Sequence, residues 1–223
     1  MNLYPVLLDL RGAPCLVVGG GAVATRKVRG LLAAGAAPTV IAPEISPELA
    51  EHKEGGRIDH VSSSFEDALL EAFQLVFVAT SDPKVNADVA RLAREAGVWV
   101  NVADDPDGSS FQVPAHFRRG ELTVAISTGG ASPAEARRVR EEIEHYFPSS
   151  YGDYLELLRK IRARLLDRDG PGSAGNAERF TGLVRSGLRE RFLAGDTAGS
   201  DAILREILGP GYSIETLRGG GES

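Results

Sequence analysis

The sequence predicts an α/β fold, with a parallel sheet and crossover helices in the first half of the chain and an all-helical C-terminal region. Two observations support this prediction. In the first half, short apolar runs rich in β-branched residues alternate with helical patterns, which is typical of parallel strands joined by helices. From Tyr151 onward such runs are missing, and apolar residues recur at spacings of three and four.

The expected strands of the sheet occupy residues 15–19, 38–42, 58–62, 75–81 and 98–103. Between the first two strands, the segment 22–34 carries the apolar stripe of an amphipathic helix, made up of Ala24, Val28, Leu31 and Leu32. A second helix is expected at 83–96, because Pro83 suits a first helical turn and Gly97 follows the last one.

After Val102 the chain becomes rich in turn residues, and a further strand at 121–128 and a helix at 132–147 follow. In the helical remainder, the segment 167–176 reads as a loop between helices because of its glycines and its proline. We therefore expect a sheet domain at 1–112, a small α/β unit at 113–150 and a helical domain at 151–223.

The composition excludes several classes of protein. A chain of 223 residues with a net charge of −6 and a pI near 5.3 lacks the basic surplus of a general nucleic-acid binder. Cys15 is the only cysteine, which excludes a disulfide framework and a cysteine metal cluster and fits a reducing cytoplasm. No apolar run approaches the roughly 18 residues of a membrane span, and the N-terminus lacks a secretion-signal pattern. We expect a cytoplasmic protein with no nucleic-acid or membrane partner and no metal site.

The segment CLVVGGGAVATRK contains the pattern Gly19-x-Gly21-x-x-Ala24 between an expected strand and an expected helix. This is the context of the dinucleotide-binding fingerprint of Rossmann-type domains. The first glycine permits a tight turn, the second lets a pyrophosphate approach the backbone, and the small third residue allows close helix–strand packing. Free N–H groups at the helix start attract the anion. We interpret the turn as a dinucleotide site, and a tight turn without a ligand is the alternative.

The end of the second strand reads VIAPE, where a dinucleotide site usually has an acidic residue that binds the ribose. Glu44 comes slightly late for this role but can still reach the ribose from the loop. No arginine stands there to favour a 2′-phosphate, so the residues favour NAD over NADP. The alternative is that Glu44 is a solvated loop residue.

Two aspartates, Asp104 and Asp105, follow the fifth expected strand in the segment NVADDPDGSSF. In open α/β sheets ligands bind outside the carboxyl ends of the strands, so these carboxylates stand where a cofactor and a substrate would meet. A carboxylate there can act as a general base or bind a metal ion. The alternative is turn chemistry, because Asp-Pro-Asp-Gly is a typical turn sequence.

The segment STGGASPAEARRVR joins a strand end to a helix start. Ser132 and Glu135 form a capping-box pattern, and Pro133 suits the first helical turn. Between Val113 and Arg140 five arginines stand against two glutamates, which indicates an anion site or, equally, an arginine-rich solvated helix face.

Several motifs occur together in one order: YPVLLDLRG, CLVVGGGAVATRKVRGLLAAGA, VATSDPKVN, NVADDPDGSSFQVPA and RRGELTVAISTGGASPAEARRVREEIE. This order resembles the precorrin-2 dehydrogenase / sirohydrochlorin ferrochelatase family of siroheme synthesis over about residues 2–165. STGGASPAEARRVR is the most distinctive motif. The helical remainder carries no motif that matches.

The resemblance implies NAD-dependent oxidation of precorrin-2 to sirohydrochlorin, with Fe²⁺ insertion into sirohydrochlorin in many members. It implies that Asp104 is the catalytic residue and that residues 113–150 form the dimerisation region of a homodimer. It implies NAD contacts at Ala22, Val23, Pro43 and Glu44, beside the fingerprint glycines Gly19 and Gly21. For the polycarboxylate substrate we assign Thr128, Arg137 and Arg138.

Two other readings of the residues stay open. A dinucleotide-sensing regulatory module would explain the fingerprint and the helical region, but it would have no use for Asp104 or the arginines. A structural dimer without a cofactor is the weaker alternative. His116 is the imidazole nearest to these motifs, and one histidine does not make a metal site.

Overall fold

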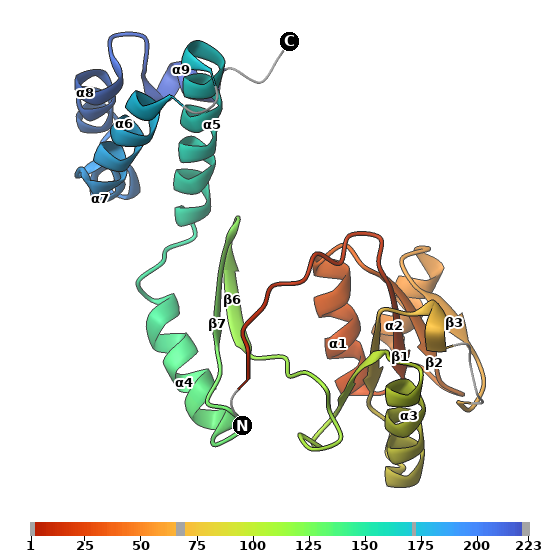
Figure 1. Ribbon diagram of the computed structural model, residues 1–223. Coiled ribbons are helices and arrows are strands. Elements are labelled where there is room, and N and C mark those ends of the chain that lie inside the picture. The colour runs from red at the N-terminus through yellow and green to blue at the C-terminus, as the bar shows by residue number, and fades with distance from the viewer. Residues whose placement is uncertain (1–2, 66–69, 171–172, 220–223) are drawn as a thin grey trace. The chain divides into compact units, whose positions relative to one another are not determined.

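The computed structural model describes residues 3–65, 70–170 and 173–219, and the chain divides into two compact units, Met1–Val113 and Pro114–Ser223. The first unit contains a five-stranded parallel sheet in the order β3-β2-β1-β4-β5 (Figure 1). Its strands are β1 (Pro14–Val18), β2 (Ala37–Ile41), β3 (Asp59–Val61), β4 (Leu75–Val78) and β5 (Trp99–Val102). Its helices are α1 (Ala22–Ala33), α2 (Pro47–Glu54), the short 3-10 helix η1 (Leu70–Ala72) and α3 (Pro83–Glu95).

The carboxyl ends of the strands meet at one edge of this sheet, which we call the strand-end edge. In register, Val18 lies opposite Ile41 and Val78, and Val78 lies opposite Val102. Hydrogen bonds continue one residue past the strands, because the Ala79 N–H donates to Val18 and the Ala103 N–H donates to Val78, each at 2.8 Å. The segments that follow β1, β4 and β5 therefore leave the sheet side by side. The chain order reverses between β1 and β4, which is the switch point where open α/β sheets bind ligands.

Both faces of the sheet are buried, as an all-parallel sheet requires. Side chains alternate along each strand, so Cys15 and Val17 of β1 pack on the side of α1 and α2, while Leu16 and Val18 pack on the side of α3. The α1 stripe predicted from the sequence is buried at Ala24, Val28 and Leu31.

The second unit starts with an antiparallel hairpin, to which a helix and a helical bundle are attached. The hairpin consists of β6 (Ala115–Arg119) and β7 (Leu122–Ile126), and α4 (Pro133–Glu144) packs on both strands. The bundle consists of α5 (Tyr151–Asp169), α6 (Ala174–Arg185), α7 (Leu188–Leu193), α8 (Thr197–Leu208) and α9 (Ile214–Arg218). Its core is formed by buried side chains from all five helices, among them Ile161, Leu183, Leu188, Leu204 and Leu217.

Close backbone contact and a row of aromatic rings join the hairpin to the bundle within this unit. A Cβ on Gly120 would lie 2.9 Å from the Gly152 Cα, so neither position has room for a side chain. Phe147 packs at 5.9 Å from the Phe117 ring and at 4.9 Å from the Tyr151 ring. The start of α5 is therefore fixed on the hairpin.

The predicted parallel α/β sheet and the helical C-terminal region are confirmed. The prediction did not include α2, η1 or β6. The expected loop at 167–176 was too long, because α5 continues to Asp169 and α6 starts at Ala174; residues 171–172 of that loop lie outside the described residues. Across the described ranges, no helix combines the length and the apolar character that a bilayer crossing needs.

Candidate active site

The glycine turn after β1 lies at the switch point of the sheet. Gly19 has φ +117°, a conformation that favours glycine, and a Cβ there would stand 2.3 Å from the Ala79 carbonyl oxygen. Its N–H donates to Ile41 at 2.9 Å. The first glycine of the fingerprint makes the tight turn that the sequence predicted, and it lets this turn pass between the ends of β2 and β4.

Gly20, the middle glycine, is required for close packing, although the fingerprint allows any residue at its position. A Cβ on Gly20 would lie 1.9 Å from the Glu44 carbonyl oxygen, and the Gly20 carbonyl accepts a hydrogen bond from the Ser46 N–H at 2.9 Å. The glycine turn and the loop after β2 are thus interlocked through their backbones. Sequence reasoning missed this position because the pattern treats it as variable.

The start of α1 has the features of a pyrophosphate site. Gly21 is the N-cap of α1, and an added Cβ would meet open space. No side chain caps this helix end, and its first turn contains no acidic residue. Exposed N–H groups with the positive end of the helix dipole suit an anion, so the residues fit a bound dinucleotide. Ala22 is exposed beside Gly21, and Val23 is half-buried behind it.

The proposed ribose-side residues lie in the loop between β2 and α2. Pro43 and Glu44 are both exposed. Their backbone is held in place, since the Ser62 hydroxyl donates to the Pro43 carbonyl at 3.2 Å and the Glu44 carbonyl abuts Gly20. The Glu44 side chain is therefore exposed on a loop whose backbone is fixed.

The motif VATSDPKVN forms a rigid turn after β4. The Thr80 hydroxyl donates to the Asn86 Oδ1 at 2.6 Å, and the Asn86 amide donates back to the Thr80 carbonyl at 3.2 Å. Asp82 caps the start of α3 by accepting from the Lys84 N–H at 2.8 Å. This turn lies at the strand-end edge, directly after β4.

Asp104 occupies an unusual turn after β5. It is the one residue other than glycine with a positive φ, 61°, among those that the structure describes. The turn closes through a bridge between Val102 and Asp105. The Asp104 side chain is exposed, and such a left-handed conformation at a non-glycine residue is typical of functional sites.

Asp105, its neighbour, has a structural role. Its carboxylate accepts a hydrogen bond from the Gly108 N–H at 2.8 Å, and its carbonyl accepts one from the Ser109 hydroxyl at 2.7 Å. The Ser109 and Ser110 hydroxyls in turn bind the Val102 and Val100 N–H groups at 2.9 and 2.8 Å. The DPDGSS part of the motif therefore holds the turn in shape, and Asp104 stands exposed beside it.

Lys27 and Asn101 form a pair near this turn that sequence reasoning did not assign. The Lys27 Nζ donates to the Asn101 Oδ1 at 2.9 Å, although the two residues are 74 positions apart. Asn101 is buried in an otherwise apolar strand. A polar residue inside the run VWVNV is the signal that could have drawn attention to it.

The proposed substrate residues lie in the second unit, around the start of α4. The Thr128 hydroxyl donates to the Ser132 carbonyl at 3.0 Å and accepts from the Ser132 N–H at 3.1 Å. Ser132 caps α4 through the Glu135 N–H at 3.2 Å, as predicted. Glu135 completes no reciprocal cap among the contacts of the described residues, because it binds Arg138 instead.

Glutamates satisfy most of the arginine cluster. Arg138 pairs with Glu135 at 2.6 Å and with Glu142, and its hydrogen bonds to Glu135 hold the pKa of Glu135 below its usual value. The remaining pairs join Arg119 to Glu144 at 2.9 Å and Arg140 to Glu141 at 2.9 Å and to Glu144 at 2.5 Å. The segment for which the sequence showed a surplus of positive charge ended at Arg140. Glu141, Glu142 and Glu144, which neutralise this charge, follow directly after it. Arg137 donates only a long hydrogen bond of 3.4 Å to the Pro133 carbonyl among the contacts of the described residues.

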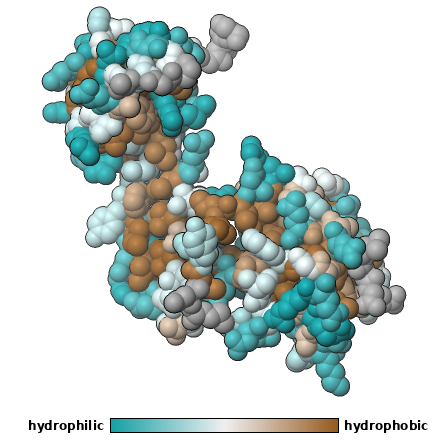
Figure 2. Space-filling model, in the orientation of Figure 1, coloured by the Kyte–Doolittle hydropathy of each residue, from teal (hydrophilic) through white to brown (hydrophobic). Residues whose placement is uncertain are grey.

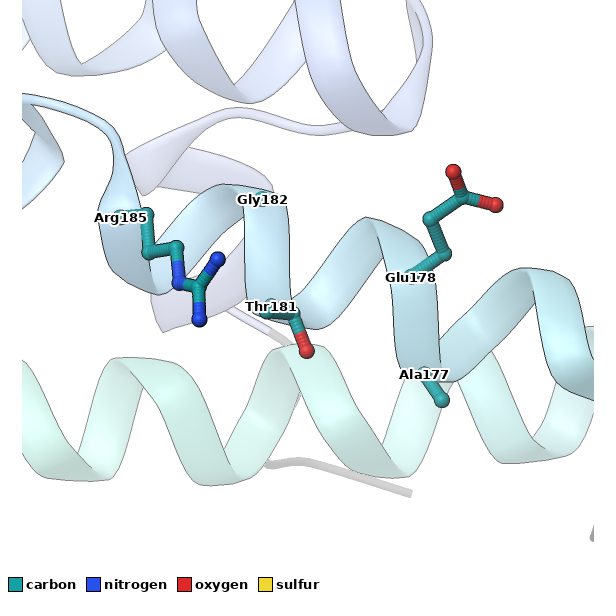
Figure 3. A pocket seen from close by; sticks show the side chains of 5 residues that line it. All are labelled: Ala177, Glu178, Thr181, Gly182 and Arg185. Carbon is teal, nitrogen blue, oxygen red and sulfur yellow. The ribbon is translucent and has the colours of Figure 1, made fainter.

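Other candidate features carry less chemistry. His116 is exposed, and its Nδ1 lies 3.1 Å from the Pro114 carbonyl oxygen. In the described part of the chain, no three His, Cys, Asp or Glu side chains gather in a way that could hold a metal ion. An open groove of about 430 Å³ runs along α6, where Ala177 and Thr181 point toward the neighbouring helix and Glu178 points away (Figure 3). Arg185 is the second charged residue of the groove. The residues that line the groove do not pair a nucleophile with a general base.

Comparison with known proteins agrees with this geometry. Residues 6–115 match a family model described as putative NAD(P)-binding, and residues 119–146 match one described as the central part of a sirohaem biosynthesis protein. Siroheme synthase of Chromobacterium violaceum is 38% identical over 216 residues, which cover 95% of this chain and 45% of the relative. Siroheme synthase of Thioalkalivibrio sulfidiphilus is 37% identical over 222 residues, with coverages of 100% and 45%. The chain thus spans about half the length of these relatives.

A solved structure named SirC, precorrin-2 dehydrogenase, matches with a TM-score of 0.74 and 32% sequence identity. The match covers 92% of this chain and 98% of SirC. Since it extends over almost the whole of both chains, and both family models match in the same order, this chain belongs to the precorrin-2 dehydrogenase family of siroheme biosynthesis.

Proposed function

We propose that the chain is an NAD-dependent dehydrogenase that oxidises precorrin-2 to sirohydrochlorin. The observation that carries this proposal is the common position of two features. The glycine turn, with the uncapped start of α1, and the Asp104 turn both follow strands that end at the strand-end edge of one sheet. A dinucleotide site and an exposed carboxylate at that edge suit a redox reaction with proton transfer.

In this mechanism the α1 start binds the pyrophosphate, and the glycine turn holds the backbone open for it. NAD, when bound, supplies the acceptor for the hydride that leaves the macrocycle. Asp104 accepts the accompanying proton as general base, so the oxidation releases one hydride and one proton from precorrin-2. Asp105 keeps the turn in shape and takes no part in proton transfer.

The substrate is a polycarboxylate, for which arginine is the preferred partner. We assign Thr128, Arg137 and Arg138 to its binding. Arg138 would have to exchange its glutamates for substrate carboxylates, whereas Arg137 has no such partner to give up among the described contacts. The second unit would also form a homodimer. The single buried thiol and the coenzyme fit the cytoplasm.

The decisive experiment is an anaerobic assay of the purified chain with precorrin-2 and NAD. We expect turnover for the wild type, a loss of about 10²–10⁴-fold for Asp104→Asn, and near wild-type turnover for Asp105→Asn. The two variants make the same chemical change at adjacent positions, and asparagine can keep the Gly108 hydrogen bond at position 105. Adding Fe²⁺ to the same assay tests whether sirohydrochlorin is also a substrate for iron insertion.

If NADH binds and precorrin-2 is not turned over, the chain is a dinucleotide sensor and the proposal fails. If Asp104→Asn and Asp105→Asn have the same turnover, Asp104 is not the general base. The dehydrogenase activity itself is tested separately, by the turnover of the wild type.

A further inference from the structure

Lys27 is a charged side chain that the mechanism above does not use. It lies on α1, one and a half turns after the pyrophosphate site, and it is partly buried. Its Nζ donates to the Asn101 Oδ1 at 2.9 Å and lies 5.4 Å from the centre of the Phe77 ring. A partly buried ammonium is costly unless it is paired, so these contacts show a position built to hold one.

The acceptor of Lys27 is itself fixed. Asn101 lies opposite Phe77 in the β4–β5 register, so both side chains point to the face of the sheet that α1 covers. The Asn101 amide donates to the Phe111 carbonyl at 3.0 Å, and the Phe111 ring packs edge-on against Phe77 at 5.4 Å. Asn101 stands three residues before Asp104 and Phe111 seven residues after it. The contacts that begin at Lys27 therefore hold both ends of the turn that carries Asp104.

The charges near Lys27 point in the same direction. Burial lowers the pKa of Lys27, the neighbouring Arg26 lowers it further, and the attraction of Asp104 opposes both effects. Asp104 is thus the carboxylate whose field acts on this ammonium.

We propose that Lys27 is a positioning residue for Asp104: anchored on Asn101 and packed over Phe77, its ammonium fixes the ends of the turn that carries Asp104 and so holds this carboxylate at the strand-end edge. Lys27 keeps its own proton throughout, and Asp104 receives the proton that precorrin-2 loses. This inference rests on the proposed function, since it takes Asp104 as the base.

The test is a double-mutant cycle with Lys27→Met, Asp104→Asn and the double variant, in which kcat for precorrin-2 oxidation is measured. Methionine keeps the unbranched shape of the side chain, one atom shorter, and removes its charge. We expect Lys27→Met to lower kcat about tenfold in the wild-type background and to have no further effect in the Asp104→Asn background. The NADH dissociation constant, from fluorescence titration, should change less than about twofold, and Lys27→Arg should recover most of kcat.

Arg29→Met is the matched control, because it removes an exposed cation from the same helix, one paired with Glu48 at 2.8 Å. It should leave kcat unchanged. An equal loss of kcat on Lys27→Met in both backgrounds would mean that Lys27 only supports the fold, and this overturns the proposal. A weaker NADH affinity with unchanged kcat also overturns it, since Lys27 would then be a cofactor residue. If Asp104→Asn alone keeps the wild-type rate, Asp104 is not the base. This result refutes the proposed mechanism and is distinct from the results that refute only the role of Lys27.

Discussion

At the scale of single residues, substitutions of Asp104 should affect stability and activity differently, because this residue has a left-handed backbone conformation. A side chain with φ near 60° costs roughly 1–2 kcal/mol for most L-residues, and less for Asp and Asn. We predict that Asp104→Gly unfolds with a free energy about 1 kcal/mol larger than that of Asp104→Ala, while both variants lose turnover. Urea unfolding followed by circular dichroism measures the difference. Equal midpoints for the two variants would show that the turn carries no strain.

Two of the three glycines of the turn differ in what a substitution would do. Gly21→Asp should abolish NADH binding while the fold is kept, because the new carboxylate enters open space at the helix start and repels the pyrophosphate. Gly20→Ala should instead destabilise the first unit, because its Cβ would overlap the Glu44 carbonyl oxygen. Fluorescence titration with NADH and thermal unfolding distinguish the two effects. Unchanged NADH affinity in folded Gly21→Asp would contradict the assignment of the site.

Cys15 gives the first unit a built-in pH dependence. Burial raises the pKa of its thiol from 9.0 to about 11. Above pH 9 the unfolded chain therefore loses a proton that the folded chain retains, and the free energy of unfolding should fall between about pH 9 and 11. Native protein should react slowly with a thiol reagent at pH 8, whereas protein in guanidinium should react at once. Rapid labelling of the native state would mean that β1 opens readily.

At the scale of elements, the sequence predicted the helices with a long apolar periodicity and the strands that are almost fully apolar. It did not reveal α2, since only Leu49 and His52 of that helix are buried, although Ser46 and Pro47 form a start signal that could have found it. It did not reveal β6, in which Phe117 is the one buried residue and charged neighbours hide the alternation. The pairing of Lys27 with Asn101 depends on long-range register, which local patterns do not contain.

The candidate site follows the same pattern. The glycine turn and the Asp104–Asp105 pair drew attention because each follows a strong strand, whereas the choice of Asp104 over Asp105 came from the family resemblance, and the roles of these residues stay predictions. The arginine cluster was overstated, because the charge of a helix face depends on partners three and four residues away and the glutamates of α4 follow the arginines.

Within α4, the two assigned arginines should therefore differ. Arg137→Gln is expected to raise the KM for precorrin-2 about tenfold, because the Arg137 guanidinium has no carboxylate partner among the described contacts and is available to a substrate carboxylate. Arg138→Gln should raise it less, since this side chain already pairs with Glu135 and Glu142. Steady-state kinetics at saturating NAD measures both values. A larger effect at Arg138 would show that the substrate displaces the glutamates.

At the scale of the whole molecule, apolar surface predicts self-association. Tyr4, Leu7 and Tyr146 are 87%, 79% and 80% exposed, and β7 leaves Leu122, Val124 and Ile126 only partly covered. Figure 2 shows apolar surface along the part of the second unit that carries β6, β7 and α4. Surface of this kind marks an interaction site. Light scattering at micromolar concentration should give twice the 23.7 kDa of one chain, and a monomer would contradict the proposed homodimer.

The left-handed turn at Asp104 also bears on how this protein can change over generations. Asparagine tolerates that backbone conformation as well as aspartate does, and a single G-to-A transition in the first codon position converts one into the other. Such a mutation would leave the sheet, the glycine turn and the Lys27 contacts as they are. Under the proposed role of Asp104, one nucleotide change would thus turn the enzyme into a folded protein that binds NADH without turnover, and a gene duplicate would reach the role of a dinucleotide sensor by that step alone.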